Sequence, residues 1–127
     1  MSKKQFLLEN QREGEVDAGL ILSHDTTEPD YHLFLLPGEQ LDVQWQAAID
    51  WAKGIGGDLP TRREQSLLIA NCKHEFKSTW YWSNTSYERD SSCAWVQGFY
   101  GGSQGTSPKY DGNHARAVRR LPIVEIV

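Results

Sequence analysis

Residues that could perform covalent chemistry or bind a metal are scattered through this 127-residue sequence. Cys72 and His74 lie two positions apart, but no second ligand pair follows at the spacing of a zinc site. One stretch, Gly101-Gly102-Ser103-Gln104-Gly105, matches the letters of the Gly-x-Ser-x-Gly turn of serine hydrolases, but it lies in a Gly/Ser-rich loop and not between a predicted strand and a predicted helix. The His-Glu-x-x-His motif of zinc proteases is absent. The glycines at 54, 56 and 57 precede Pro60 and are typical of a helix end, not of a phosphate-binding loop. We therefore expect no catalytic residue, no metal ligand, no cofactor and no enzymatic activity.

Two other segments have the composition of binding surfaces. Residues 84–92 and 101–113 are rich in Tyr, Ser, Gly and Asn. Tyr gives contact area at a low cost in entropy, and the small polar residues adapt their hydrogen bonds to a partner. Solvated loops share this composition, so that simpler interpretation stays open. The candidate partner-binding residues are Tyr87, Arg89, Tyr100, Tyr110 and Asn113.

The arginines near the C-terminus suggest a buried ion pair. On a strand, Arg119 would share a face with Ala115 and Ala117 and point inward. A buried unpaired charge is too costly to persist. We therefore expect Arg119 to pair with a carboxylate, either Asp58 or Glu64.

Strand and helix patterns alternate in a way that predicts an α+β fold. Residues 19–22 and 31–36 read as a hairpin, and residues 80–84, 93–100 and 115–121 as later strands, with an apolar edge strand at 123–127. Apolar residues recur at helical spacing from Trp45 to Ala52, with Asp42 in place as an N-cap. Thr61 and Glu64 form a capping box at the start of a second helix. The aromatic residues between 80 and 100 are expected to build the core.

Composition limits the classes of protein to which this chain can belong. Hydrophobic residues make up 39%, charged residues 24%, and the net charge is −4. This overall acidity argues against direct nucleic-acid binding. The charge is uneven, because residues 1–50 carry three Lys/Arg against ten Asp/Glu. No apolar run approaches the roughly 20 residues that cross a membrane. With only two cysteines, Cys72 and Cys93, we expect a protein that stays in a cytoplasm.

Several blocks in order resemble a known family. They are Trp45-x-x-Ala48, Gly57-Asp58-Leu59-Pro60-Thr61-Arg62-x-Glu64, Trp80-Tyr81-Trp82-Ser83, Trp95 and Ala115-Arg116-Ala117-Val118-Arg119. Over residues 40–121 the chain resembles the Lcl C-terminal-like domain, a family of unknown function in bacteria and phages. The resemblance implies a C-type-lectin-like fold, with two helices packed on a small twisted antiparallel sheet and loops displayed at one end. Residues 1–16 would be a flexible segment and 17–127 a single C-type-lectin-like domain.

Two positions limit what the resemblance carries over. Ala117 stands where the family pattern has a cysteine, which weakens any thiol role. The triplet Glu28-Pro29-Asp30 resembles a calcium-lectin motif but precedes both predicted helices, and its residues are turn formers. We therefore predict no calcium site.

The expected function is that of a non-enzymatic phage or prophage module that binds a host or phage protein. It could inhibit a host defence complex in the host cytoplasm, in the manner of anti-CRISPR proteins. The alternative is a virion tail or receptor-binding accessory that recognises a surface glycan or protein. We expect no membrane association, and a homodimer could form through the C-terminal strand at 123–127.

Overall fold

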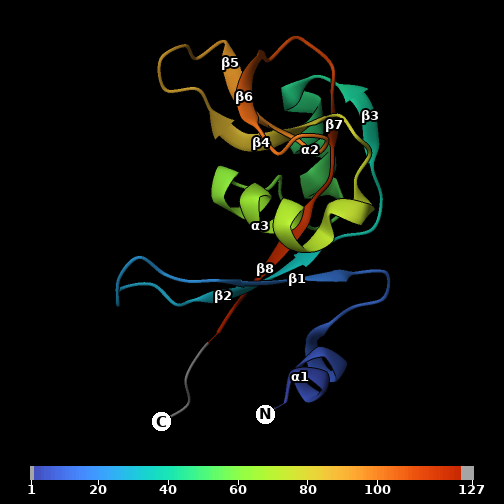
Figure 1. Cartoon of the computed structure of the whole chain (residues 1–127), viewed down its shortest axis with the longest axis vertical. Helices are drawn as coiled ribbons and strands as arrows, with labels where there is room; N and C mark the ends of the chain where they lie inside the picture. The colour runs from blue at the N-terminus through green and yellow to red at the C-terminus, as the bar shows by residue number, and fades with distance from the viewer. Residues whose placement is uncertain (1, 124–127) are drawn as a thin grey trace.

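The computed structural model describes residues 2–123, and it confirms a mixed α+β fold (Figure 1). The elements in chain order are α1 (Lys3–Asn10), β1 (Val16–Ile21), β2 (Tyr31–Leu35), β3 (Gln40–Val43), α2 (Trp45–Gly54), α3 (Arg62–Cys72), a 3-10 turn (Lys73–Glu75), β4 (Trp80–Ser86), β5 (Cys93–Gly98), β6 (Gln104–Pro108), β7 (Asn113–Ala115) and β8 (Val118–Pro122).

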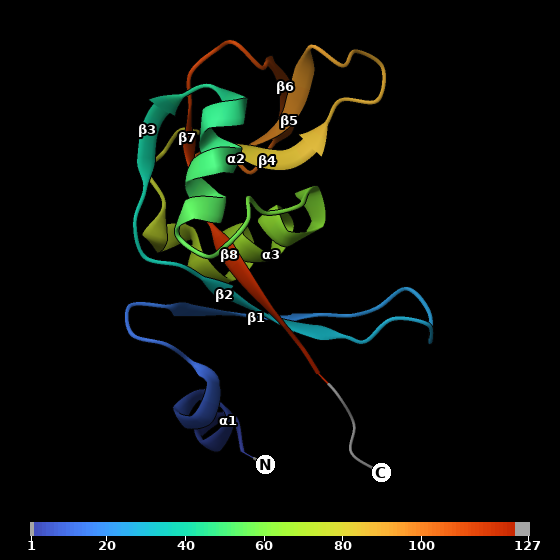
Figure 2. The same ribbon diagram turned by 180° about the vertical axis from the view of Figure 1, so that it is seen from behind.

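The strands form two sheets, where the sequence had suggested one. One sheet has the order β1-β2-β8, and the other has the order β3-β7-β4-β5-β6. Most neighbours are antiparallel, but β4 and β7 run parallel. Helix α3 lies between the two sheets in both views (Figures 1 and 2). The expectation of two helices on one antiparallel sheet was therefore wrong in both counts, since the described residues contain three α-helices.

The three-stranded sheet is built on the predicted hairpin. Its central strand β2 alternates between two faces: Leu33 and Leu35 pack with α3, while His32 and Phe34 face α1. Strand β8 pairs with β2 over its whole length. Burial on both faces explains why β2 is almost continuously apolar.

Helix α2 has the predicted apolar stripe but begins later than predicted. Its N-cap is Gln44, not Asp42, because Asp42 belongs to β3 and has a positive φ of 49°. The helix ends at a tight turn where Gly57 approaches other backbone. A Cβ on Gly57 would lie 2.7 Å from the carbonyl oxygen of Val118, so only glycine fits.

Helix α3 begins as its sequence predicts. Thr61 Oγ1 accepts a hydrogen bond from the Glu64 N–H at 3.1 Å, and Glu64 Oε1 accepts one from the Thr61 N–H at 2.8 Å. This capping box fixes the entry of the helix. It also places the Glu64 carboxylate in the interior.

The five-stranded sheet differs from prediction at three places. Strand β6 lies within the segment at 101–113, which has the composition of a loop, and β3 was not predicted. Tyr81 and Trp82 are both buried, because α3 covers one face of β4 and α2 lies over the other. Trp80, however, is 41% exposed and Tyr100 is 79% exposed, so the expectation that the aromatic residues between 80 and 100 build the core was wrong for these two.

The two chain ends also bear on the predictions. The segment at 1–16, expected to be flexible, contains helix α1 and the buried residue Glu15. Ser2 caps α1 by accepting a hydrogen bond from the Gln5 N–H at 3.1 Å. At the other end, residues 124–127 of the predicted edge strand lie outside the described residues, and so does the homodimer expected there.

Candidate binding site

Three of the five predicted binding residues lie at one end of the five-stranded sheet. Tyr87 and Arg89 are in the β4–β5 turn and Tyr110 follows β6, at the top of Figure 1. The Lys109 N–H donates to the Ser92 carbonyl oxygen at 2.8 Å, which joins the two loops. Tyr110 is 72% exposed and Arg89 is exposed as well. We call this surface the loop end.

Part of the loop end is held by its own side chains. The Tyr87 ring meets Trp95 edge-on, with ring centroids 5.3 Å apart. On the Trp95 ring lies the Arg62 guanidinium, 3.4 Å from the centroid, and the Trp95 indole N–H donates to Glu88. Tyr87 therefore helps to order the turn and is only half-exposed, while Arg89 and Tyr110 are the available side chains.

The structure separates Tyr100 from this group. Trp80 pairs with Gly98 at one end of the β4–β5 ladder, whereas Ser86 pairs with Ala94 at the other. Tyr100 follows Gly98, so it lies at the end of β5 remote from the β4–β5 turn. Tyr100 therefore does not belong to the loop end.

Asn113 lies on β7 and faces β6. Its amide Nδ2 donates to Ser107 Oγ at 3.0 Å. Asn113 thereby borders a small hollow on the face of the sheet that also carries Trp80. It is half-buried and does not belong to the exposed surface of the loop end.

Trp80 is the residue that sequence reasoning missed. A Cβ added to Gly98 would meet three atoms of its six-membered ring at 3.2–3.3 Å, and one on Gly105 would meet two of them at 3.9 Å. The indole therefore rests flat on two strand glycines. A glycine inside a strand often marks a close approach of another group, and Gly98 and Gly105 were the available signal for this contact.

Two hollows flank the Trp80 ring. The first has a volume of about 350 Å³ and is lined by Ser78, Thr79, Tyr100 and Ser103 beside the ring and two glycines. The second has a volume of about 160 Å³ and is lined on its polar side by Thr106, Ser107 and Asn113. Trp80 forms a wall of both hollows, so they make one interrupted groove, which we call the Trp80 groove.

The charged residues of the interior form a structural cluster around Glu64. Arg120 contacts the Glu64 carboxylate with Nε at 2.6 Å and Nη2 at 2.8 Å, and Asp58 with Nη1 at 2.8 Å. Burial opposes ionisation of Glu64, but its hydrogen bonds and the charge of Arg120 outweigh burial, so its pKa lies below the ordinary value. Burial and the hydrogen bond to Glu64 raise the pKa of Tyr31 to about 12. Arg120, not Arg119, is thus the partner of Asp58 and Glu64.

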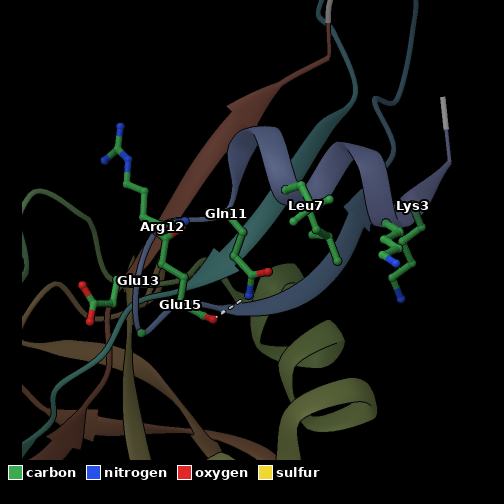
Figure 3. A pocket seen from close by; sticks show the side chains of 9 residues that line it. Lys3, Leu7, Gln11, Arg12, Glu13 and Glu15 are labelled. Carbon is green, nitrogen blue, oxygen red and sulfur yellow. Dashed lines mark hydrogen bonds between the residues drawn. The ribbon is translucent and has the colours of Figure 1, made fainter.

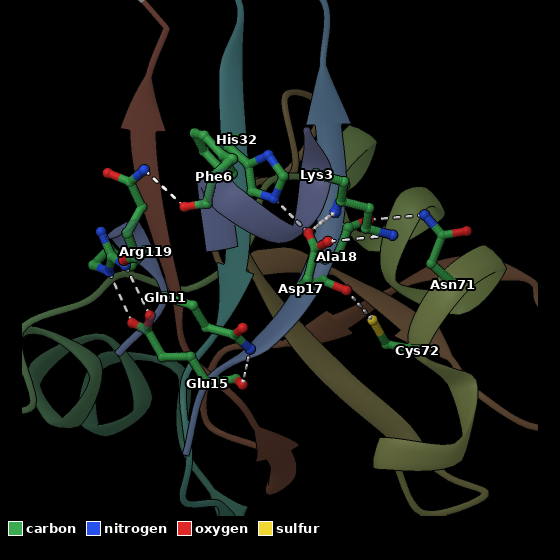
Figure 4. A network of polar contacts seen from close by, with 12 residues as sticks. Lys3, Phe6, Gln11, Glu15, Asp17, Ala18, His32, Asn71, Cys72 and Arg119 are labelled. Carbon is green, nitrogen blue, oxygen red and sulfur yellow. Dashed lines mark hydrogen bonds and ion pairs between the residues drawn. The ribbon is translucent and has the colours of Figure 1, made fainter. Parts of the chain in front are cut away.

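Arg119 points to the opposite face of β8 and holds the N-terminal segment. It contacts both carboxylate oxygens of Glu15, at 2.8 and 2.7 Å, and donates to the Asn10 carbonyl oxygen at 2.9 Å (Figure 4). Burial raises the pKa of Glu15, but the hydrogen bonds and the charge of Arg119 lower it by more. The pKa of Glu15 therefore lies below its ordinary value. Arg119 is therefore inward and paired as expected, but its carboxylate is Glu15 and neither Asp58 nor Glu64.

A second polar contact lies next to Arg119 under helix α1. His32 contacts Asp17, and Lys3 reaches the same carboxylate at 3.7 Å (Figure 4). The Phe6 ring covers His32 with centroids 4.7 Å apart. Each of these groups has a partner within the fold, so the arrangement attaches α1 to the three-stranded sheet.

A wide hollow of about 840 Å³ lies between α1 and the turn that follows it (Figure 3). It is larger than the hollows beside Trp80, but its cations do not converge. Lys3 and Arg12 lie at opposite ends of the view, and the Gln11 side chain is bonded to the Glu15 carbonyl oxygen. We therefore treat it as open surface beside a helix and not as a site for an anion.

Two observations on the described residues bear on metal binding and thiol reactivity. Within residues 2–123, no three His, Cys, Asp or Glu side chains come together as a metal site would need. Cys72 is fully buried, and burial together with nearby Glu75 and Asp17 raises its thiol pKa. No helix in that range is long and apolar enough to cross a membrane. The chain matches no protein-family model and no curated protein.

Proposed function

We propose that this protein is a non-enzymatic recognition module of C-type-lectin-like architecture whose loop end binds a partner protein. The observation that carries the proposal is the joining of two loops at one end of the five-stranded sheet, with Arg89 and Tyr110 exposed. Arg and Tyr are enriched among residues that dominate binding energy at protein interfaces. Loops held by a rigid scaffold are also where binding residues are concentrated.

The charge of the loop end favours a protein over a nucleic acid. Glu88, Arg89 and Asp90 follow one another in the first loop, and Lys109 and Asp111 flank Tyr110 in the second. Mixed charge suits a complementary protein surface, whereas a nucleic acid needs a continuous basic surface. The loop end offers no such surface.

The biological setting follows from the resemblance to the Lcl C-terminal-like domain. We infer a phage or prophage protein that acts in the host cytoplasm and inhibits a host defence complex, as anti-CRISPR proteins do. The small size and the acidity of residues 1–50 support this setting. The alternative is a virion accessory, and mass spectrometry of purified particles would separate the two, because only an accessory is present in the particle.

A capture experiment tests the loop end itself. The tagged protein is incubated with host lysate, any captured protein is identified, and its affinity is measured with purified components. Arg89→Ala/Tyr110→Ala should weaken binding at least 10-fold, while Lys4→Ala/Leu8→Ala on α1 should leave it unchanged. If no protein is captured reproducibly at several salt concentrations, or if the loop-end variant binds as well as the native chain, the proposal is wrong.

A further inference from the structure

We propose that the Trp80 groove binds a neutral saccharide, one ring of which stacks on the open face of the Trp80 indole. The groove is separate from the loop end, and the inference does not depend on the proposed partner protein. Three observations support it: the position of the ring, the chemistry of the lining, and the absence of charge. Each concerns side chains within the described part of the chain.

The first observation is that the indole is held in place before any ligand arrives. One face lies on the backbone of Gly98 and Gly105, yet 41% of the residue is exposed. The opposite face is therefore the one in contact with solvent. A pyranose ring presents a flat face of C–H groups, which packs on an aromatic ring and removes apolar area from water. Because the indole is already fixed, little rotamer entropy is lost on binding.

The second observation is that hydrogen-bonding groups surround the ring on both sides. The groups are six hydroxyls and one amide close to the wall formed by Trp80, together with backbone at three glycines. The hydroxyls and the amide belong to Ser78, Thr79, Tyr100, Ser103, Thr106, Ser107 and Asn113. Hydroxyls and amides both donate and accept, as sugar hydroxyls do. An aromatic wall with a few polar groups is also the usual composition of a small-molecule site.

The third observation is that neither hollow beside Trp80 is lined by a Lys, Arg, Asp or Glu side chain in the described chain. The hollow beside α1, in contrast, is lined by Lys3, Lys4 and Arg12. A sulfated, phosphorylated or acidic ligand would enter the Trp80 groove without a counter-charge. The lining therefore favours an uncharged polyhydroxy ligand.

A proline-rich peptide is the other ligand that stacks on an exposed tryptophan. Such peptides dock into grooves lined by several aromatic residues. Here one indole is surrounded mainly by hydroxyl groups, and the second aromatic residue, Tyr100, is 79% exposed. The saccharide is thus favoured, and the peptide becomes one outcome of the test.

The test is a titration of the full chain with a panel of neutral sugars, observed through the indole N–H signal of Trp80 by NMR. The panel is maltotriose, cellotriose, mannotriose, chitotriose and lactose, with a polyproline decapeptide as the peptide probe, each titrated with and without EDTA. Trp80→Phe assigns the signal. We expect at least one sugar to shift it. Isothermal titration calorimetry, which does not need the indole signal, should show that sugar's binding weakened at least 5-fold by Tyr100→Ala and at least 10-fold by Trp80→Ala.

Two further variants keep the result interpretable. Gly98→Ala places a methyl group against the indole and should weaken binding by displacing the ring, with the fold checked by circular dichroism. Arg89→Ala, at the loop end, should change nothing. The proposal is overturned if no sugar shifts the Trp80 signal at millimolar concentration, if EDTA abolishes binding, if Tyr100→Ala and Gly98→Ala both bind normally, or if only the peptide binds.

Discussion

Removing the Arg120 guanidinium should leave an unpaired carboxylate in the interior of the protein. The Glu64 side chain has no exposed surface, and Arg120 contacts both of its oxygens. Breaking a buried ion pair by removing one partner typically costs about 3–5 kcal/mol. We therefore expect Arg120→Ala to lower the free energy of unfolding by an amount in this range at pH 7.

Proton uptake by Glu64 limits this loss and gives it a distinctive pH dependence. Without Arg120, the Glu64 carboxylate can bind a proton and become neutral. Protonating a glutamate of ordinary pKa costs about 3.7 kcal/mol at pH 7 and about 1 kcal/mol at pH 5. In the native protein the pKa of Glu64 is lowered, so its carboxylate stays ionised at both pH values. The destabilisation caused by Arg120→Ala should therefore shrink by up to about 2.7 kcal/mol between pH 7 and pH 5.

Urea unfolding followed by tryptophan fluorescence measures both quantities. The native chain, Arg120→Ala and the exposed control Arg89→Ala are compared at the two pH values, and the control should differ from the native chain by less than about 0.5 kcal/mol. A loss below about 1 kcal/mol at pH 7 would refute the role given to the ion pair. An equal loss at both pH values would show that packing, and not the charge of Glu64, is responsible.

Two more predictions concern the lowered pKa values of two carboxylates and the crowding around one glycine. Folding lowers the pKa values of Glu15 and Glu64. The stability that the two carboxylates contribute is therefore present above the pKa of the unfolded chain, about 4.3, and is lost as the pH falls through the pKa values of the folded protein. An unfolding free energy that stays constant from pH 5 to pH 2 would contradict this. Gly57→Ala should destabilise by about 1–3 kcal/mol because its Cβ would overlap neighbouring atoms. The control is Gly54→Ala at the end of α2, where an added Cβ would meet no atom within 4 Å. Thermal unfolding should show this variant to be as stable as the native chain or up to about 1 kcal/mol more stable. Equal effects of the two substitutions would show that steric crowding is not the cause.

Local signals in the sequence predicted the elements whose causes are local. The capping box of α3 depends on two residues three positions apart, and both of its hydrogen bonds form. The first hairpin likewise follows from two apolar runs around a turn. Strands β3 and β6 were missed because polar and glycine-containing segments become strands only when a neighbouring strand pairs with them.

The wrong partner for Arg119 has a specific physical cause. We counted alternation from Ala115 through Ala117 to Arg119 as if one strand contained all three residues. In the structure β7 ends at Ala115 and β8 begins at Val118, because the chain passes from one sheet to the other between them. A period of two holds only within one continuous strand. The face of Arg119 was therefore set by its pairing with Phe34, which the sequence does not reveal.

The same reasoning explains the misplacement of Trp80. Whether a strand residue is buried depends on which element covers that part of the sheet, and α2 covers the position of Trp82 but not that of Trp80. Two glycines then support the ring from below. Exposure of Trp80 is thus a property of the assembled layers and could not be read from a run of aromatic residues.

The paired arginines of β8 and the proposed binding surfaces occupy different parts of the fold. Arg119 and Arg120 lie on β8 of the three-stranded sheet. Arg119 is bonded to Glu15 and to the Asn10 carbonyl oxygen at the end of α1, and Arg120 to Glu64 on α3 and to Asp58. The loop end and the Trp80 groove both belong to the five-stranded sheet. Since these arginines already have partners within the protein, their clustering is explained by the attachment of helices to the sheet. Recognition is therefore to be sought on the other sheet, where tyrosine, tryptophan and hydroxyl groups remain open to a ligand.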